Sequence, residues 1–237
     1  MHINRVEFVI TRACTGRCKH CSLGLGEAEP SNEHIEYAKL TGLLTCLKFA
    51  LPIASVMCFG GEPLLHADEV CAILAEAKAA GIPQRELITN GFFSRDPAKI
   101  KETAEKLNAC ATDVMLSVDA FHQETIPLEP VQLFARHAQN LMLHPAWLVS
   151  PEDNNPWNVK TREILAQFGD IPVSDGNVIF AQGNALKYLA EYFTQDTPRL
   201  SGYEGQPSLS IEPSGNVLGP GGMPGNAYRD DILQLLR

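Results

Sequence analysis

The chain has 237 residues, 45% of them hydrophobic, and a formal charge of −9 at pH 7. This length suits one large α/β domain, and the composition is typical of a globular protein and excludes a fibrous or disordered one. The negative charge argues against a broad nucleic-acid-binding surface. No apolar run approaches the roughly 20 residues of a membrane-spanning helix, so we expect neither a nucleic-acid partner nor a membrane.

The compartment can be inferred from the N-terminus and the cysteines. The first residues lack the basic and apolar regions of a secretion signal and begin like a strand. The chain contains seven cysteines, and an odd number fits reduced thiols better than a set of disulfides. Both features predict a cytoplasmic protein.

Short apolar runs alternate with longer amphipathic ones. Predicted strands cover 6–10, 54–59, 85–91, 113–119, 145–150 and 177–182, and the predicted helices between and after them cover 31–50, 67–81, 96–109, 130–143, 157–168 and 185–193. Six such units with apolar strands predict a parallel sheet flanked by helices. We expect an α/β fold, a partial (β/α)6 barrel of parallel strands open on one side, although an open doubly wound sheet also fits.

The end of the chain has a different composition. Residues 207–226 are rich in glycine, proline and serine, with a hairpin predicted around Ser214–Asn216 and a short helix after it. We therefore divide the chain into a barrel at 1–195 and an extension at 196–237 that packs on the barrel. The glycine-rich run at 219–225 is predicted to be a flap across the barrel mouth.

Reactive and polar residues follow the predicted strands. In parallel β/α folds, the loops at the carboxyl ends of the strands carry the functional groups and meet at one rim. The candidates after the first four strands are Cys14, Cys18 and Cys21; Gly60, Gly61, Glu62 and Pro63; Asn90; and Ser117 and Asp119. One site at this rim is therefore expected.

The three cysteines form a C-x₃-C-x₂-C run that could bind a metal. Thiolates are soft ligands for zinc and for iron–sulfur clusters. A structural zinc site uses four ligands, and His20 could be the fourth only by folding back between its neighbours, which is geometrically awkward. Three thiolates on a [4Fe–4S] cluster leave one iron with an open position. The residues favour a cluster, while zinc and ordinary free thiols stay open.

The run CTGRCKHC, followed by FGGEP at the end of the next strand, resembles the radical S-adenosylmethionine (radical SAM) superfamily. The cluster-binding loop of that family has this cysteine spacing, and its second strand ends in a similar glycine-rich motif. ITNG and SVDAF, after the third and fourth strands, also match the family. The resemblance covers about residues 4–185 and implies an enzyme with a [4Fe–4S] cluster and S-adenosyl-L-methionine as cofactors.

The resemblance also implies a role for each candidate. Cys14, Cys18 and Cys21 would be the metal ligands, and S-adenosylmethionine would chelate the fourth iron. In the GGEP motif, the glycines would let the backbone approach the methionyl group, and the glutamate would accept from its ammonium group. The residues implied to contact S-adenosylmethionine are Gly60, Gly61, Glu62 and Pro63 of this motif, His20 near the adenine, and Asn90, Ser117 and Asp119 near the carboxylate or ribose.

The implied reaction needs a one-electron donor of the flavodoxin or ferredoxin type, which reduces the cluster. S-adenosylmethionine is then cleaved to methionine and a 5′-deoxyadenosyl radical, which abstracts hydrogen from a substrate. The loops at 121–130 and 150–158 should overhang the rim. They supply six candidate substrate contacts, namely His122, Gln123, Glu124, Glu152, Asp153 and Trp157.

The tail resembles the SPASM/twitch-type extension of relatives that modify peptides, but it contains no cysteine for an auxiliary cluster. The first predicted strand begins almost at the first residue, so we expect no separate leader-binding domain before the barrel. We therefore expect a small-molecule substrate, with a peptide- or protein-modifying enzyme as the alternative and a non-catalytic iron–sulfur or zinc protein as the second alternative. The four other cysteines have apolar neighbours and are predicted to be buried as small hydrophobic residues: Cys46, Cys58, Cys71 and Cys110.

Overall fold

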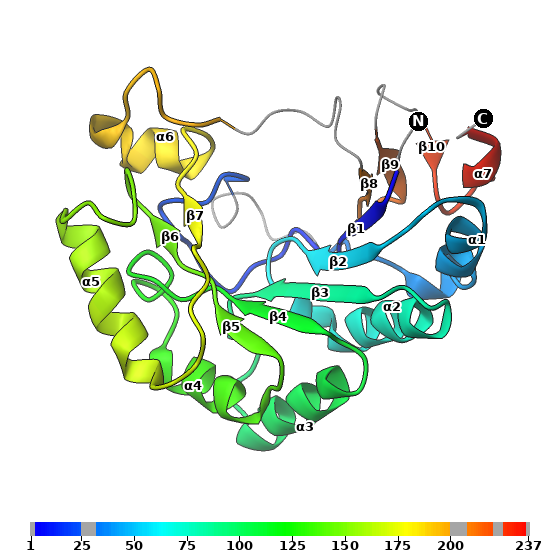
Figure 1. Cartoon of the computed structure of the whole chain (residues 1–237), viewed down its shortest axis with the longest axis horizontal. Coiled ribbons are helices and arrows are strands. Elements are labelled where there is room, and N and C mark those ends of the chain that lie inside the picture. The colour runs from blue at the N-terminus through cyan, green and yellow to red at the C-terminus, as the bar shows by residue number, and fades with distance from the viewer. Residues whose placement is uncertain (1–2, 25–31, 200–207, 220–224, 236–237) are drawn as a thin grey trace.

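The computed structural model describes residues 3–24, 32–199, 208–219 and 225–235 (Figure 1). Its main sheet contains β1 (Arg5–Val9), β2 (Ser55–Phe59), β3 (Gln84–Thr89), β4 (Asp113–Leu116), β5 (Leu141–Leu143), β8 (Ser208–Ile211), β9 (Asn216–Leu218) and β10 (Gly225–Asn226). The strand order is β10-β9-β8-β1-β2-β3-β4-β5. Strands β8 and β1 to β5 pair in parallel, and the sheet is curved but not closed. The predicted open partial barrel is confirmed.

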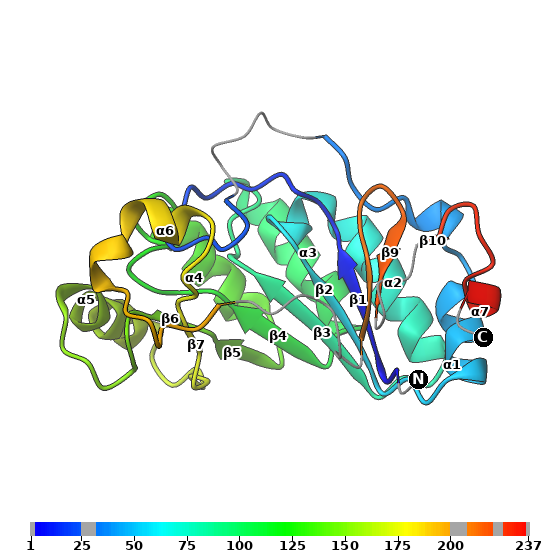
Figure 2. The ribbon, with the colours of Figure 1, turned by 90° about the horizontal axis from the view of Figure 1, so that it is seen from above.

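The described residues also form seven α-helices and four 3-10 helices. They are α1 (Leu43–Ala50), α2 (Ala67–Ala79), α3 (Pro97–Asn108), α4 (Leu128–His137), α5 (Pro156–Leu165), α6 (Asn184–Tyr188), α7 (Ile232–Leu235), and the 3-10 helices η1 (Tyr37–Lys39), η2 (Pro63–His66), η3 (Ala166–Phe168) and η4 (Ala190–Tyr192). Figures 1 and 2 show α1 to α4 along the convex face of the sheet. None of the helices in the described residues is long and apolar enough to span a bilayer.

The two faces of the strands follow from the alternation of side chains. Phe8, Cys58, Leu87 and Val114 are neighbours in register across β1 to β4, and all four are buried. They belong to the core between the sheet and the helices. The preceding positions in the same strands, from Glu7 on β1 onward, lie on the concave face.

The fifth and sixth strands differ from the prediction. The run at 145–150 was expected to be one strand, but β5 ends at Leu143, and a separate strand, β6 (Ala146–Trp147), pairs with β7 (Asn177–Val178) in a two-stranded sheet. Pro145 lies between β5 and β6 and has no N–H to donate to a ladder. The helix predicted at 130–143 is also too long, because α4 ends at His137 and β5 occupies 141–143.

The helix predicted at 31–50 is also shorter in the structure. Gly42 has φ of +85° and precedes the first residue of α1, so the chain turns sharply there. Before it, only η1 is helical in the described part of that range. The burial predicted for all four remaining cysteines is wrong for Cys46, which is exposed on α1, whereas Cys58 and Cys110 are buried and Cys71 is partly buried.

The C-terminal residues are part of the main sheet. Strand β8 pairs in parallel with β1, and β9 folds back on β8 through a turn in which Gly215 has φ of +83°. The hairpin predicted around Ser214–Asn216 is therefore present. The flap predicted at 219–225 falls mostly outside the described residues.

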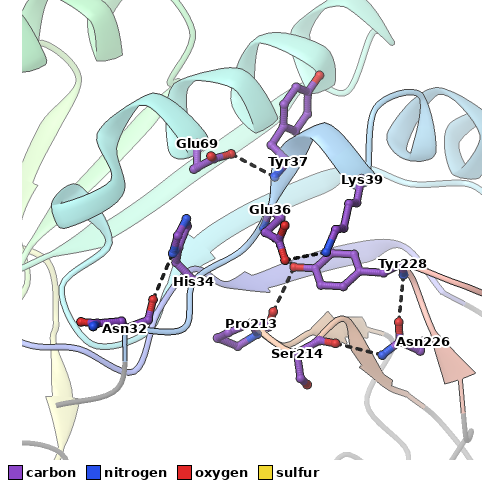
Figure 3. A network of polar contacts seen from close by, with 10 residues as sticks. All are labelled: Asn32, His34, Glu36, Tyr37, Lys39, Glu69, Pro213, Ser214, Asn226 and Tyr228. Atoms are coloured by element: carbon purple, nitrogen blue, oxygen red, sulfur yellow. Dashed lines mark hydrogen bonds and ion pairs between the residues drawn. The ribbon is translucent and has the colours of Figure 1, made fainter.

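Polar contacts attach this hairpin to the segment before α1 (Figure 3). The Tyr228 hydroxyl donates to the Pro213 carbonyl at 3.0 Å and accepts from the Glu36 N–H at 3.0 Å. The Asn226 amide donates to the Ser214 carbonyl at 2.9 Å and accepts from the Tyr228 N–H at 3.0 Å. Residues far apart in sequence are thus held together beside β1, the strand that leads into the cysteine loop.

Candidate active site

A cavity of about 710 Å³ opens at the carboxyl ends of the central strands. The rim that the sequence predicts is therefore one continuous space. Ten of the predicted residues line it: Cys14, Cys18, His20, Cys21, Gly60, Gly61, Asn90, Ser117, Asp119 and His122.

The cysteine loop follows β1 directly and folds into two tight turns. The Cys21 N–H donates to the Cys18 carbonyl at 3.2 Å, and the Gly24 N–H donates to the Cys21 carbonyl at 3.2 Å. Asn184, at the start of α6, holds the same loop from the other side. Its backbone N–H donates to the Cys21 carbonyl at 2.9 Å and its side-chain amide to the Cys18 carbonyl at 3.2 Å. No local pattern indicates this contact, because Asn184 lies 166 positions after Cys18.

The chemistry of the three thiols fits a metal site. Burial raises the pKa of Cys14 to about 11, and the nearby Glu62 carboxylate adds to this effect. Burial likewise raises the pKa of Cys18, with the charge of Asp119 as a further cause. Such thiols are poor nucleophiles at neutral pH, since the thiolate is the reactive form. A bound metal would deprotonate them, so the donor set suits an iron–sulfur cluster better than covalent catalysis.

Gly60 and Gly61 bring the end of β2 into backbone contact with the cysteine loop. The Gly61 N–H donates to the Thr11 carbonyl at 2.8 Å. A Cβ on Gly60 would lie 2.6 Å from the same carbonyl oxygen, and a Cβ on Gly61 would overlap the carbonyl of Ala13. The protein's own backbone therefore requires both glycines. Their approach to the methionyl group of S-adenosylmethionine stays a prediction.

Glu62 is fully buried and does not line the cavity. Its carboxylate accepts from the Leu64 N–H at 2.9 Å, the Thr89 hydroxyl at 2.6 Å and the Asn90 N–H at 2.8 Å. These bonds tie the end of β2 to the end of β3. The role toward an ammonium group stays a prediction. Pro63 is buried beside it and begins η2.

Burial raises the pKa of Glu62 from 4.5 to about 6, which makes a prediction for stability. Because the folded pKa is the higher one, the folded protein binds this proton more tightly, and stability falls as pH rises from 4.5 to 6. We expect Glu62→Gln to remove this change, which amounts to about 2 kcal/mol. Urea unfolding at several pH values would measure the difference between the two proteins.

The control is Glu152→Gln, because this side chain is exposed and lies in a loop outside the cavity. It should follow the wild-type pH profile. Equal pH profiles for Glu62→Gln and wild type would show that the Glu62 carboxyl does not titrate in this range.

Asn90 and Ser117 follow β3 and β4. The Asn90 amide donates to the Thr15 hydroxyl at 3.2 Å, and its nitrogen lies 3.8 Å from the Cys14 sulfur, so it links β3 to the cysteine loop. Ser117 lines the cavity, and in the described part of the chain its hydroxyl has no hydrogen-bond partner. Of the two, Ser117 has the side chain with an unused donor for a ligand.

Asp119 is fully buried and anchors the loop after β4. One carboxylate oxygen accepts from the N–H groups of Phe121 and His122, both at 2.9 Å. The other accepts from the His122 Nδ1 at 2.8 Å and the Ala146 N–H at 3.0 Å. Burial opposes ionisation, but the His122 ring and these donors outweigh it and hold the pKa of Asp119 well below its usual range. Each oxygen already accepts two hydrogen bonds from the protein.

The His20 ring turns back toward the cysteine loop. A ring nitrogen of His20, a ring nitrogen of His122 and the Cys18 sulfur lie within 4.8 Å of one another. The His20 Nδ1 is buried and has no hydrogen-bond partner among the described residues. The ring therefore does fold back toward Cys18, although the sequence analysis judged this geometry awkward. The group of three donors does not include Cys14 or Cys21.

The two loops predicted to contact the substrate contribute little to the lining of the cavity. Of their six candidate residues, His122 alone lines the cavity. Glu124 forms an ion pair with Lys19 at 2.9 Å, and Trp157 stacks on Phe121 with ring centroids 4.5 Å apart. Gln123 accepts from the Asp119 N–H, Asp153 accepts from Asn155, and Glu152 is exposed. These loops therefore pack around the cysteine loop.

Comparison with known proteins agrees with the fold and the motifs. The model of the Radical SAM superfamily matches residues 8–141, which is more than half of the chain. The chain is 30% identical over 93 residues to GTP 3′,8-cyclase of Moorella thermoacetica (strain ATCC 39073 / JCM 9320). That match covers 38% of this chain and 28% of the cyclase, so the chain matches little more than a quarter of its curated relative.

Solved structures with a similar fold include Streptococcus suis SuiB bound to precursor peptide SuiA, with a TM-score of 0.62 and 14% identity over 99% of this chain and 64% of that chain. Native anSMEcpe with bound AdoMet has a TM-score of 0.61 and 14% identity over 99% and 80% of the two chains. BtrN in complex with AdoMet and 2-DOIA has a TM-score of 0.54 and 14% identity over 99% and 83%. At this identity the likeness concerns the fold.

The family match, the open parallel barrel and three cysteines on one cavity are mutually consistent. This chain therefore belongs to the radical SAM superfamily, whose enzymes use a [4Fe–4S] cluster and S-adenosylmethionine.

Proposed function

We propose that this protein is a radical SAM enzyme that acts on a small-molecule substrate. The observation that supports this most is that Cys14, Cys18 and Cys21 line the same enclosed space as the glycine end of β2. When bound and reduced by a flavodoxin- or ferredoxin-type donor, the cluster supplies the electron that splits S-adenosylmethionine into methionine and a 5′-deoxyadenosyl radical, which takes a hydrogen atom from the substrate.

The residues of the chain would hold and orient these groups. Cys14, Cys18 and Cys21 would supply three thiolate ligands. The unused Ser117 hydroxyl would donate to the carboxylate or ribose of S-adenosylmethionine, and the His20 ring would lie beside its adenine. Glu62 and Asp119, whose carboxylates bond to the protein, would fix the loops that position these groups.

A peptide substrate is the second candidate. SuiB, which has a similar fold, was solved with its precursor peptide, and a further anSMEcpe structure contains the Cp18Cys peptide. BtrN was solved with AdoMet and 2-DOIA. We favour a small molecule because the cavity of about 710 Å³ must also hold the cluster and S-adenosylmethionine, which leaves little room beside them for a peptide.

The experiment is anaerobic reconstitution with iron and sulfide, followed by reduction with dithionite in the presence of S-adenosylmethionine. We expect 5′-deoxyadenosine and methionine in equal amounts, separated by chromatography. Protein that takes up zinc but no iron and sulfide would contradict the proposed function.

A further inference from the structure

The cavity extends below the rim to the strands of the sheet. Glu7 on β1 and Met57 on β2 line it and are neighbours in register. The same row continues through Glu86 on β3 to Asp113 on β4. Glu7 lies two residues before the end of β1, about 7 Å below the start of the cysteine loop. This floor is separate from the rim residues predicted to hold S-adenosylmethionine.

The Arg5 guanidinium forms ion pairs with two carboxylates at this floor. The Arg5 Nε lies 3.1 Å from a Glu7 oxygen, and its Nη2 lies 3.0 Å from a Glu86 oxygen. The same nitrogen donates to the Met57 sulfur at 3.1 Å. The second oxygen of Glu7 has no partner among the described residues. The row therefore holds three carboxylates, Glu7, Glu86 and Asp113, against the single positive charge of Arg5.

His144, on the wall beside this floor, adds no positive charge. His144 lines the cavity, with Nδ1 2.8 Å from the Ser174 hydroxyl and Nε2 2.7 Å from the Asn177 amide nitrogen. Because the Ser174 hydroxyl donates to the Leu143 carbonyl, it accepts the Nδ1 proton, and Nε2 accepts from Asn177. The ring is thus neutral, and burial lowers its pKa.

Among the described residues that line the cavity, none is a lysine or an arginine. By sequence, the segments outside the described ranges contain no lysine, and Arg237 is their only arginine. Phosphate and carboxylate groups are normally held by such side chains. A nucleoside triphosphate, the substrate that the name of the curated relative suggests, would find no lysine or arginine in the lining of this cavity.

We propose that the substrate has a protonated amine that binds the free carboxylate oxygen of Glu7 at the strand floor of the cavity. This inference rests on the proposed function. An ammonium group would offset part of the excess negative charge at the floor and give the second oxygen of Glu7 the donor that it lacks. The rest of the substrate would then extend from the floor toward the cysteine loop, where the hydrogen atom is removed.

The test uses cluster-loaded wild type and the variants Glu7→Gln and Glu86→Gln. A small-molecule extract of the organism that encodes the protein is separated at pH 7 into cation-retained, anion-retained and unretained fractions. Each fraction is added with S-adenosylmethionine and dithionite, and 5′-deoxyadenosine is compared with the same protein without extract. We expect only the cation-retained fraction to stimulate wild type.

Glu86→Gln is the matched control, because Glu86 also pairs with Arg5 and is similarly buried, but it does not line the cavity. It should respond like wild type. Glu7→Gln should need at least about tenfold more of the active fraction, since a hydrogen bond to a charged group contributes about 1.5–3 kcal/mol. Equal thermal unfolding of the two variants would exclude a folding defect as the cause.

Several results would overturn the inference. These are stimulation by the anion-retained or unretained fraction, no stimulation by any fraction, or an equal response of the two variants. Weaker S-adenosylmethionine binding to Glu7→Gln in equilibrium dialysis would also overturn it, since Glu7 would then contact the cofactor. If wild type forms no 5′-deoxyadenosine under any condition, the proposed function itself fails.

Discussion

Replacing Cys14, Cys18 or Cys21 by alanine, one at a time, will prevent the protein from holding a [4Fe–4S] cluster. In a [4Fe–4S] cluster each thiolate ligand binds a different iron, so the two remaining thiolates would leave two irons without protein ligands. We expect reconstituted wild type to contain about four iron and four sulfide ions per chain. Each variant should contain less than half of this and form no 5′-deoxyadenosine above the protein-free background.

Cys46→Ala is the matched control for these three variants. It removes one thiol in the same way, but Cys46 is exposed on α1 and does not line the cavity. It should bind as much iron and sulfide as wild type. A full cluster in any of the three loop variants would show that the missing residue is not a ligand, and His20 would then be the next residue to replace.

The sequence predicts the first four strands well because their local signals agree. Each is a short run with apolar residues at its centre, and β2, β3 and β4 are followed directly by Gly60, Asn90 and Ser117, where the chain leaves the sheet. The prediction fails for the fifth and sixth units because a buried apolar run does not show which strand it pairs with. Ala146, Leu148 and Ile179 are apolar and buried, but they pack with Phe121 in a second, smaller cluster beside the main core.

For the site, motif spacing finds the residues that line the rim but not their partners. Glu62 and Asp119 are both at the predicted positions, yet each directs its carboxylate to N–H groups of neighbouring loops. These bonds join residues that are 27 or 28 positions apart, so no local pattern shows them. They depend on which strand ends are adjacent in the sheet.

Glu7 was missed for a related reason. A charged residue that alternates with apolar ones in a strand normally indicates the solvent face. In an open barrel the same alternation points into the concave side, which contains the cavity. Glu7 and Arg5 therefore look like surface residues in the sequence. The signal that could have identified them is the number of parallel strand–helix units, which predicts a curved sheet with a concave inner face.

Gly61→Ala should both destabilise the protein and prevent cluster binding. A Cβ at this position would overlap the Ala13 carbonyl, and the atoms involved are backbone atoms that no rotamer change can move. The cysteine loop would have to shift, which would break the bonds from the Gly61 N–H to Thr11 and from the Glu62 N–H to Ala13, both 2.8 Å. We expect the free energy of unfolding to fall by about 3 kcal/mol, as measured with urea.

Gly81→Ala is the control that separates a loss of stability from a loss of cluster binding. Gly81 has φ of +74° and open space where its Cβ would lie, so alanine there costs about 1–2 kcal/mol of backbone strain without touching the cysteine loop. It should be less stable than wild type but take up the same iron and sulfide. If Gly61→Ala also bound a full cluster, the loop would be able to hold its ligands without direct contact with β2. In that case the glycines would be needed for S-adenosylmethionine rather than for the loop, and the affinity for S-adenosylmethionine would fall instead.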